Sequence, residues 1–304
     1  MKEYIAFDIG GTQIKYGIVS ETGTVLKHKT VPTEIHLGGE QIIQKLILLS
    51  KILMGEHTIL GIGISTAGIV NVNKGIVTGG ADHIPGYSTI PIMNRLQEVL
   101  KVPVSIDNDV NCAAFGEKWN GSGREKGNFI MLTLGTGIGG AIFIDGELYR
   151  GHSFSAGEWG NMLIEGKAFE EVASISGLIH LVRKYKGEGD WNGKTIFELY
   201  DKGDREVTQA VEVFFKHLAV GISNLAYIFN PEMIVIGGGI TDRGNQFLKE
   251  VKEVKEVKEV KEVKEEVSKY LNKEIYNNCE IELAQNGNCA GMIGAIYHFL
   301  HHHK

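Results

Sequence analysis

The chain contains little proline, little cysteine and no excess of basic residues. Its 304 residues include 5 prolines and 3 cysteines. Cys112, Cys279 and Cys289 are odd in number and widely spaced, which argues against a disulfide framework and against a paired-cysteine motif. The 31 lysines and arginines are outnumbered by 37 aspartates and glutamates, and the net charge of −6 makes nucleic acid an unexpected partner.

Long hydrophobic runs are also missing. The longest, from Ile130 to Ile144, is interrupted by glycines and is shorter than the ~20 residues that a membrane helix needs. The N-terminal residues Met1 to Ile5 lead directly into an apolar segment and do not resemble a signal peptide. We therefore expect a cytoplasmic protein without a membrane partner.

Glycine, in contrast, is abundant and clustered. The chain has 40 glycines, and several of them directly follow apolar segments that are typical of buried strands. Glycine at the end of a strand allows a ligand to approach the backbone closely. The length suits about two domains of roughly 150 residues each.

The pattern of apolar and polar residues predicts an α/β protein whose two halves repeat. In each half an apolar strand, a glycine turn, a second strand and a tight turn follow one another, first at 4–31 and again at 129–147. Such a repeat indicates two related lobes. The predicted strands are 4–9, 14–19, 25–31, 60–65, 104–106, 129–134, 141–144, 233–236 and 279–283, with a hairpin at 69–80. The predicted helices are 39–54, 92–100, 112–119, 169–184, 206–229 and 288–300.

Two segments near the C-terminus have unusual composition. Lys-Glu-Val is repeated from Lys249 to Val263. Valine at every third position drifts around a helix of about 3.6 residues per turn, so these valines do not form one buried stripe. We interpret 249–267 as a solvent-exposed helical extension produced by tandem duplication, with a charged interaction helix as the alternative. His301-His302-His303 allows a metal-binding tract, although a frayed terminus is the simpler interpretation.

Polar residues follow the strand at 104–106. They are Asp107, Asn108, Asp109 and, after one valine, Asn111. Open α/β sheets bind ligands at the carboxyl ends of their strands, which is where these carboxylates and amides are expected. Asn and Asp are also common helix caps, and this stretch by itself favours a capped helix. The glycine turns upstream and downstream of it favour a catalytic site.

The first glycine turn follows Asp8 and contains Gly10, Gly11 and Thr12. A carboxylate at a strand end can hold a metal ion directly or through water. Bare N–H groups of Gly10 and Gly11, together with the Thr12 hydroxyl, would bind an anion such as phosphate. A plain Gly-Gly hairpin is equally compatible with these residues.

Two further glycine turns lie in the second half. The run from Gly135 to Gly140 is followed by a predicted strand, which argues against a dinucleotide-binding fingerprint because that motif opens a helix. The run Gly237-Gly238-Gly239 ends another strand. Its bare backbone fits a nucleotide site, where it can lie flat against a base or ribose.

Four motifs together resemble the ROK family of bacterial sugar kinases and sugar-responsive repressors. They are Asp8-Ile9-Gly10-Gly11-Thr12, Asn108-Asp109-Val110-Asn111, Gly135-Thr136-Gly137-Ile138-Gly139-Gly140 and Gly157-Glu158-Trp159-Gly160. The resemblance covers nearly the whole chain, and the segment 294–300 is most similar to the β-glucoside kinase branch. It implies an actin-like, hexokinase-type fold of the ribonuclease H-like class, with an active-site cleft between a lobe at 1–108 plus 290–304 and a lobe at 109–289. It also implies a homodimer.

The resemblance further implies a kinase that uses ATP and Mg²⁺ to phosphorylate a hydroxyl of a hexose or a β-glucoside. Asp109 matches the catalytic base of the family. A carboxylate that accepts the proton of a weakly nucleophilic hydroxyl suits phosphoryl transfer. The implied sugar ligands are Asn108, Glu158, Glu170, Asn161 and Gly68. The implied ATP-binding residues are Asp8, which also holds Mg²⁺ directly or through water, Gly10, Gly11, Thr12, Gly135, Thr136, Gly137, Gly237, Gly238 and Gly239.

The sequence departs from the family at a structural zinc site. Most members carry a histidine and a cysteine cluster there, whereas this chain has Asn161 in place of the histidine and no cysteine in 163–171. Zinc needs about four such ligands, so we expect no zinc. We expect the loop 161–170 to be held by packing, through Trp159, Phe154 and Phe169. The missing histidine leaves the sugar selectivity open.

Other functions are compatible with parts of the pattern. An N-acetylmannosamine kinase of the same family would carry the same motifs. A sugar-sensing repressor would carry a helix-turn-helix ahead of Asp8, where the sequence leaves no room, and a sugar-binding regulatory protein could lack catalysis. An actin-like ATPase without a sugar substrate would not need Asn108, Asp109, Glu158 and Glu170 together.

Overall fold

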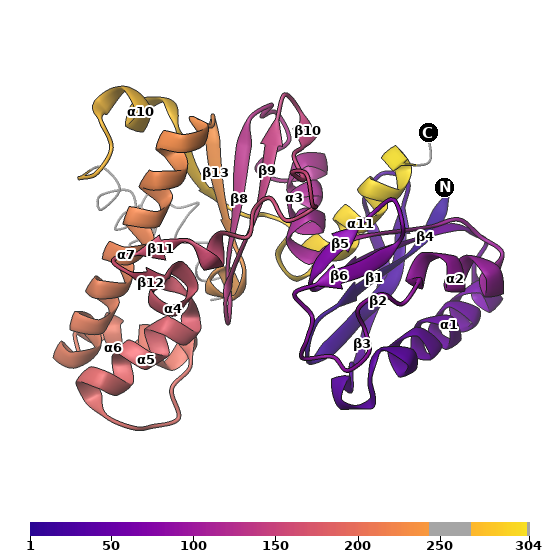
Figure 1. The fold of residues 1–304 in the computed structure, drawn as a ribbon, viewed down its shortest axis with the longest axis horizontal. Coiled ribbons are helices and arrows are strands. Elements are labelled where there is room, and N and C mark those ends of the chain that lie inside the picture. The colour runs from indigo at the N-terminus through magenta and orange to yellow at the C-terminus, as the bar shows by residue number, and fades with distance from the viewer. Residues whose placement is uncertain (243–268, 303–304) are drawn as a thin grey trace. The chain divides into compact units, whose positions relative to one another are not determined.

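The computed structural model describes residues 1–242 and 269–302, so the expected helical repeat at 249–267 lies outside the described residues. The chain forms two compact units (Figure 1). The first comprises Met1–Glu125, Arg150–Ser155 and Asn288–Lys304, and the second comprises Lys126–Tyr149 and Ala156–Gly287.

The first unit is built on a five-stranded sheet in the order β3-β2-β1-β4-β7. Its strands are β1 (Glu3–Ile9), β2 (Gln13–Ser20), β3 (Val25–Pro32), β4 (Ile59–Thr66) and β7 (Val104–Asn108). Strands β1, β2 and β3 form an antiparallel meander, whereas β1, β4 and β7 run parallel. The parallel register pairs Asp8 with Ser65 and Ser65 with Asp107, so three polar side chains lie on adjacent strands at their carboxyl ends.

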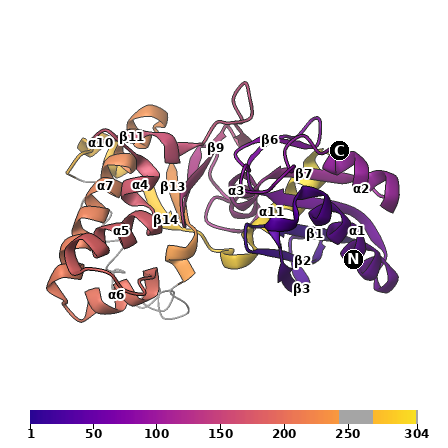
Figure 2. The same ribbon diagram turned by 60° about the horizontal axis from the view of Figure 1, so that its bottom comes forward.

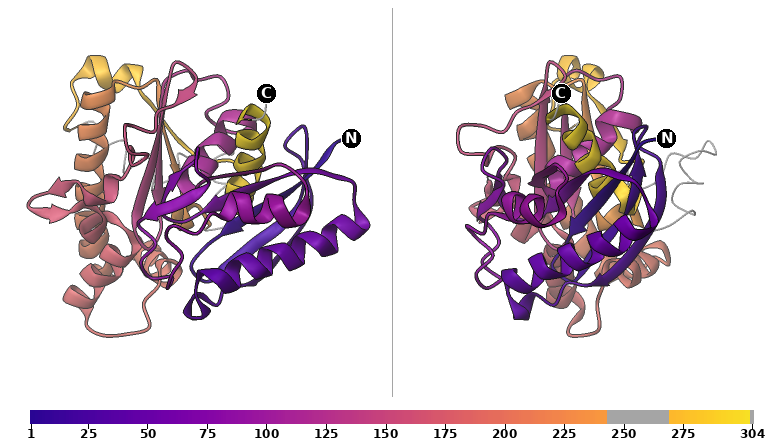
Figure 3. Two further views of the ribbon diagram at one scale, coloured as in Figure 1. Left: turned by 45° about the vertical axis from the view of Figure 1, so that its right-hand side comes forward. Right: turned by 90° about the vertical axis from the view of Figure 1, so that its right-hand side faces the viewer.

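Helices cover both faces of this sheet, and side chains alternate between the two faces along each strand. The helices are α1 (Gly39–Glu56), α2 (Ile92–Leu100), α3 (Asp109–Asn120) and α11 (Ala290–His302). On β1, Ile5 and Phe7 join the core under α1 and α2, which lie side by side in Figure 3. Tyr4 and Ala6 point to the other face, where they pack against Met292, Ile296 and Phe299 of α11. Figure 2 shows α11 beside α3 on this second face.

The second unit repeats the arrangement of the first. Its sheet has the order β10-β9-β8-β13-β14. The strands are β8 (Phe129–Leu134), β9 (Ile138–Ile144), β10 (Glu147–Leu148), β13 (Met233–Gly237) and β14 (Glu280–Leu283). Strands β8, β9 and β10 form an antiparallel meander and β8, β13 and β14 run parallel. The same order of pairings in both sheets confirms the repeat that the strand, glycine turn and strand pattern predicts.

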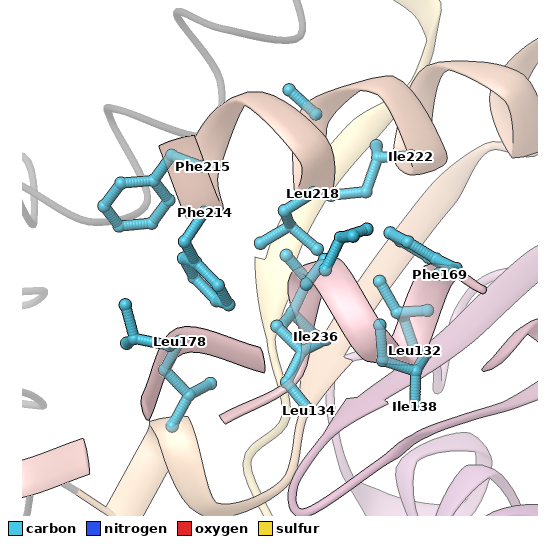
Figure 4. Packing of buried hydrophobic residues seen from close by; sticks show 14 of the residues in the cluster. Leu132, Leu134, Ile138, Phe169, Leu178, Phe214, Phe215, Leu218, Ile222 and Ile236 are labelled. Carbon is cyan, nitrogen blue, oxygen red and sulfur yellow. The ribbon is translucent and has the colours of Figure 1, made fainter. Parts of the chain in front are cut away.

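One face of the second sheet is covered by a helical layer. It contains α4 (Phe169–Ala173), α5 (Ile175–Lys186), α6 (Gly193–Asp201) and α7 (Arg205–Phe229). Figure 4 shows Leu218 and Ile222 of α7 facing Leu132 and Ile236 of the sheet. By length and composition α7 would be able to cross a membrane, yet 56% of its apolar window is buried, which is typical of a core helix.

Shorter elements complete the fold. They are β5 (Ile69–Asn71), β6 (Ile76–Gly79), β11 (Leu163–Ile164), β12 (Lys167–Ala168), α10 (Lys273–Asn278) and the 3-10 helices η1 (Ile35–Leu37), η2 (Trp159–Asn161), η3 (Gly239–Asp242) and η4 (Gly287–Cys289). The antiparallel pairing of β5 and β6 confirms the hairpin predicted at 69–80.

Local structure explains three differences from the predicted elements. The single helix predicted at 169–184 is two helices, because Ser174 is extended and its hydroxyl accepts a hydrogen bond from the Gly177 N–H, which caps α5. Helix α6 lies where no helix is predicted, although Asn192 and Thr195 form a capping box at its start. Helix α3 begins at Asp109 rather than at residue 112, because Asn108 caps it.

The division into units also differs from the expected lobes. We expected a boundary between 108 and 109, whereas α3 belongs to the first unit, where it packs against α11. The segment Arg150–Ser155 belongs to the first unit as well, although the residues on both sides of it belong to the second.

Candidate active site

Asn108 and Asp109 lie where β7 ends and α3 begins. The Asn108 side-chain oxygen accepts hydrogen bonds from the N–H groups of Val110 at 2.9 Å and Asn111 at 3.0 Å, so Asn108 is the helix cap. Its Nδ2 atom donates to Asp109 Oδ1 at 2.9 Å and to the Gly68 carbonyl at 3.0 Å. The capping and catalytic interpretations are therefore compatible, because the cap itself orients the carboxylate of Asp109.

Gly68 contributes its backbone to this arrangement. Its φ is +98°, and a Cβ atom at this position would lie 2.7 Å from the Gly79 carbonyl oxygen. Glycine is therefore required here for both conformation and space. Since the Gly68 carbonyl accepts from Asn108, the turn after β4 and the end of β7 are joined.

Asp8 lies at the carboxyl end of β1, in the middle of the same sheet. Its Oδ1 accepts a hydrogen bond of 2.7 Å from the Ser65 hydroxyl, and its Oδ2 lies 3.4 Å from Lys15 Nζ. The Asp8 side chain is 17% exposed.

Burial, followed by the charges of the nearby carboxylates, raises the pKa of the Cys112 thiol, which keeps it protonated. The carboxylates that do so are those of Asp107, Asp8 and Asp109.

The first glycine turn differs in one respect from the prediction. The N–H of Gly10 donates to the carbonyl of Gln13 at 3.0 Å and is therefore used within the turn, so the expectation that it is bare for an anion is wrong. Gly11 and Thr12 are exposed. The turn is tied down by Thr33, whose hydroxyl donates to the Gly10 carbonyl at 2.7 Å and whose N–H donates to the Thr12 carbonyl at 2.9 Å.

Two carboxylates, those of Glu158 and Glu170, lie close together in the second unit. A Cβ atom on Gly137 would lie 2.7 Å from Glu170 Oε2, and one on Gly160 would lie 2.8 Å from the same oxygen. Burial, and then the negative charge of Glu170, raises the pKa of Glu158. Two glycines thus make room for Glu170, and its charge acts on Glu158.

The loop around Asn161 is held by a hairpin and by aromatic packing. Strands β11 and β12 pair through Leu163 with Ala168 and Ile164 with Lys167. The two residues between them, Glu165 and Gly166, have φ of +51° and +81°, as a type I′ turn requires. Asn161 itself is exposed.

Two of the three aromatic residues predicted to support this loop, Trp159 and Phe169, are buried in the second unit. Phe169 is fully buried and packs against Gly221 of α7, and Trp159 packs closely on Gly140. Phe154 belongs to the first unit and packs against its core, so the prediction that Phe154 supports the loop is wrong. Among the described residues, no group of three or more His, Cys, Asp or Glu side chains is placed to hold a metal ion.

The other two glycine turns have defined backbone partners. Gly135 donates to the Gly137 carbonyl at 3.0 Å, and its own carbonyl accepts from Ile175 at the start of α5 at 2.9 Å. Thr136 is exposed at the tip. Gly238 has a φ of +91°, and a Cβ atom there would lie 2.5 Å from the Leu134 carbonyl oxygen. The turn Gly237-Gly238-Gly239 is thus a close backbone crossing at the end of β13.

The structure brings together residues that the sequence motifs did not. The carboxylate of Asp107 is 1% exposed and pairs with the guanidinium of Arg150. His298 Nε2 lies 3.9 Å from the same carboxylate. No local pattern links these residues, because Arg150 is 43 positions from Asp107 and His298 comes from the last helix. The one signal available was an aspartate directly after the segment Val104–Ile106.

The chain is similar to known proteins along nearly its whole length. The model of the ROK family matches residues 4–302. A β-glucoside kinase of Listeria monocytogenes serovar 1/2a is 36% identical over 307 residues, which cover 97% of this chain and 96% of the relative. A glucokinase of Halalkalibacterium halodurans is 31% identical over 320 residues, with coverage of 96% and 93%.

A solved structure gives the same result for the fold. The ROK family glucokinase of Streptomyces griseus, in complex with glucose and AMPPNP, matches with a TM-score of 0.78 and 26% identity. The match covers 96% of this chain and 97% of that one. Together with the two related sheets, this similarity confirms the predicted actin-like α/β fold.

Proposed function

The chain belongs to the ROK family, and we propose that it is an ATP-dependent sugar kinase that phosphorylates a hydroxyl of a hexose or a β-glucoside. Relatives named as β-glucoside kinase and glucokinase share 36% and 31% identity with it over nearly the whole chain. A β-glucoside is the preferred candidate, because the relatives of that name are more similar to this chain than those named glucokinase.

The observation that carries the proposal is the carboxylate of Asp109 at the start of α3. It is oriented by the Nδ2 group of Asn108 and by the N–H of Val110, both at 2.9 Å from Oδ1. A sugar hydroxyl is a weak nucleophile, and phosphoryl transfer requires that its proton be accepted by a group held in a fixed position. Asp109 is assigned that role.

The remaining polar residues suit a polyhydroxylated ligand. Asn108, Glu158, Glu170 and Asn161 are assigned to sugar hydroxyls, with the backbone of Gly68 holding Asn108. A site built to hydrogen-bond hydroxyl groups discriminates strongly against analogues that lack them. Asn161 stands where a histidine is expected in the family, so we assign it a part in sugar selectivity.

ATP is assigned to the glycine turns. Gly10, Gly11 and Thr12, with Gly135, Thr136 and Gly137, would approach the phosphates, and Gly237-Gly238-Gly239 would lie against the nucleoside. The partly buried carboxylate of Asp8 fits Mg²⁺, which prefers oxygen ligands and keeps several waters, so Asp8 would hold the ion directly or through water. When bound, Mg²⁺ neutralises charge on the phosphate oxygens.

The use of ATP and a sugar supports a cytoplasmic location, and we propose a homodimer on the basis of family membership. The lobes are proposed to follow the two compact units, with α3 in the first. No cofactor role is assigned to α7, whose apolar face belongs to the core.

A coupled ADP-release assay tests the proposal. Purified protein with Mg-ATP is offered glucose, cellobiose, N-acetylmannosamine, N-acetylglucosamine, mannose or fructose, and a reaction without sugar is the control. Release of ADP that depends on cellobiose or glucose is the expected result. Equal release without sugar would instead indicate an ATPase, and a response restricted to N-acetylmannosamine would correct the substrate. No release, combined with sugar binding in calorimetry, would indicate a regulatory sugar-binding protein.

A further inference from the structure

Arg150 lies where the chain passes from the second unit into the first. It is the first residue of the segment Arg150–Ser155, which belongs to the first unit while the residues before and after it belong to the second. After this segment the chain re-enters the second unit at Ala156, two residues ahead of Glu158. An interaction made by Arg150 therefore anchors this crossing of the chain within the first unit.

The partner of Arg150 is Asp107, the residue before the Asn108-Asp109 pair. The Arg150 guanidinium pairs with Asp107 Oδ2, and the two side chains are 19% and 1% exposed. The other oxygen, Asp107 Oδ1, accepts hydrogen bonds from the Asn108 N–H at 2.8 Å and from Asn111 Nδ2 at 3.1 Å. Asp107 thus holds residues on both sides of Asp109.

The guanidinium of Arg150 also packs against an aromatic ring. The Cζ atom of Arg150 lies 5.6 Å from the centre of the Phe115 ring, within the range of a cation–π interaction. The Phe115 ring also stacks on the ring of His298, with centroids 5.6 Å apart and an interplanar angle of 10°. At 3.9 Å from Asp107 Oδ2, His298 Nε2 is too distant for a hydrogen bond, so Arg150 is the direct cationic partner.

We propose that Arg150 is a positioning residue for phosphoryl transfer: through Asp107 it fixes the strand-to-helix junction that carries Asn108 and Asp109. This inference rests on the proposed kinase function. A buried carboxylate that loses its cation is left uncompensated and tends to move, and such a movement would loosen the two hydrogen bonds that Asp107 Oδ1 accepts. The consequence would fall on the chemical step through Asp109 and on sugar binding through Asn108, whereas the residues assigned to ATP lie outside this junction.

The first experiment compares Arg150→Met and Arg150→Lys with the wild type in the coupled assay. Arg150→Met is expected to lower kcat by about 10- to 100-fold and to raise the sugar KM, because the junction carries both the base and a sugar ligand, while the KM for ATP should change by less than about 3-fold. Arg150→Lys is expected to recover part of kcat, because it restores the charge but not the fork of the guanidinium. Arg95→Met is the matched control, because Arg95 pairs with Glu40 on the surface.

Two further measurements separate positioning from general stability. Adding guanidinium or methylguanidinium at millimolar concentration to Arg150→Ala should raise its kcat, whereas the same salt should not raise the kcat of Arg95→Met. In a double-mutant cycle, Arg150→Met should cost much less in the Asp107→Asn background than in the wild type, because both changes act on one interaction.

The outcomes distinguish this inference from the proposed function. A wild type with no sugar-dependent activity overturns the proposed function and this inference with it. An active wild type whose kcat survives Arg150→Met within about 2-fold overturns the positioning role and leaves the kinase function intact. If Arg150→Met fails to fold, the cycle is built from Arg150→Lys, Asp107→Asn and their combination, and full additivity between the two sites overturns the inference.

Discussion

Asn108 Nδ2 lies 2.9 Å from Oδ1 of Asp109, the next residue in the chain. The same Asn108 side chain caps α3 through its oxygen atom, so one amide group both starts the helix and orients the carboxylate. Because the cap fixes the Asn108 side chain, it also fixes the carboxylate of Asp109, the proposed base. Asn108 therefore has a structural role and a catalytic role at once, and a substitution of Asn108 would affect both.

Asp109→Asn is expected to remove most of the turnover. An amide cannot accept the proton of the sugar hydroxyl, and general base catalysis contributes about 10²- to 10⁴-fold. The amide oxygen can still accept from Asn108 and Val110, so sugar affinity should be largely kept. Steady-state kinetics and calorimetric titration of the sugar measure the two effects separately. A variant with a near-normal kcat would show that another group is the base.

The sugar KM is expected to depend on the ionisation of Glu158. Burial and then Glu170 raise the pKa of Glu158, so its carboxylate is protonated at pH values where an ordinary glutamate is ionised. Because the carboxylate accepts hydrogen bonds from hydroxyls, KM should rise as pH falls through this raised pKa. The effect on stability has the opposite sign, because a raised pKa favours the folded state at low pH and this contribution is lost as pH increases through it.

The neighbour of Glu158 can be tested directly. Glu170→Gln should lower the pKa of Glu158, since it removes the negative charge that helps to raise it. Glu171→Gln, one residue further along α4, is the matched control and should leave this pKa in place. Carbon-13 NMR titration of the Glu158 carboxyl in each variant is the measurement. Equal effects of the two substitutions would mean that Glu170 is not the charge that acts on Glu158.

Gly137→Ala is expected to weaken sugar binding by roughly 10-fold. The new methyl group would lie 2.7 Å from Glu170 Oε2, so the carboxylate must move away from its place. Gly135→Ala, in the same turn, has no atom within 4 Å of the new methyl group and is the control. Sugar affinity measured by calorimetry without ATP isolates this effect from any effect on the nucleotide. Similar losses in both variants would show that the turn, rather than Glu170, determines sugar affinity.

The sequence predicts the two related sheets because their signal is local. The strands of each meander are adjacent in the chain, and each carries its own apolar pattern and turn. The position of Asp109 is predictable for the same reason, since its strand, cap and helix are contiguous. The Arg150 partner of Asp107 could not be predicted, because it depends on a chain crossing 43 residues away.

The support of the loop 161–170 could be predicted only in part from the sequence. The absence of cysteine is visible in the sequence, and so is the presence of Trp159 and Phe169. The Glu165-Gly166 turn is a weaker signal, because Glu is uncommon at a position with positive φ. Phe154 was misplaced because sequence proximity does not show to which unit a crossing segment returns.

Phe169→Ala is expected to destabilise the protein by about 3–5 kcal/mol. Its ring is fully buried and fills the space over Gly221, so truncation leaves a cavity between α4 and α7. Leu163→Ala, in the same loop but 72% exposed, should change stability by no more than about 0.5 kcal/mol. Urea unfolding of both variants measures the difference.

Urea unfolding of the wild type with and without a chelator tests whether packing or a metal ion supports this loop. If the aromatic core and the β11–β12 hairpin hold it, incubation with a chelator should leave the urea midpoint of the wild type unchanged. A bound structural zinc would contribute directly to folding, so its removal would lower the midpoint. Metal analysis that finds one equivalent of zinc per chain, together with such a loss, would contradict support by packing. An unchanged midpoint with a large loss in Phe169→Ala would assign the support of this loop to a side chain.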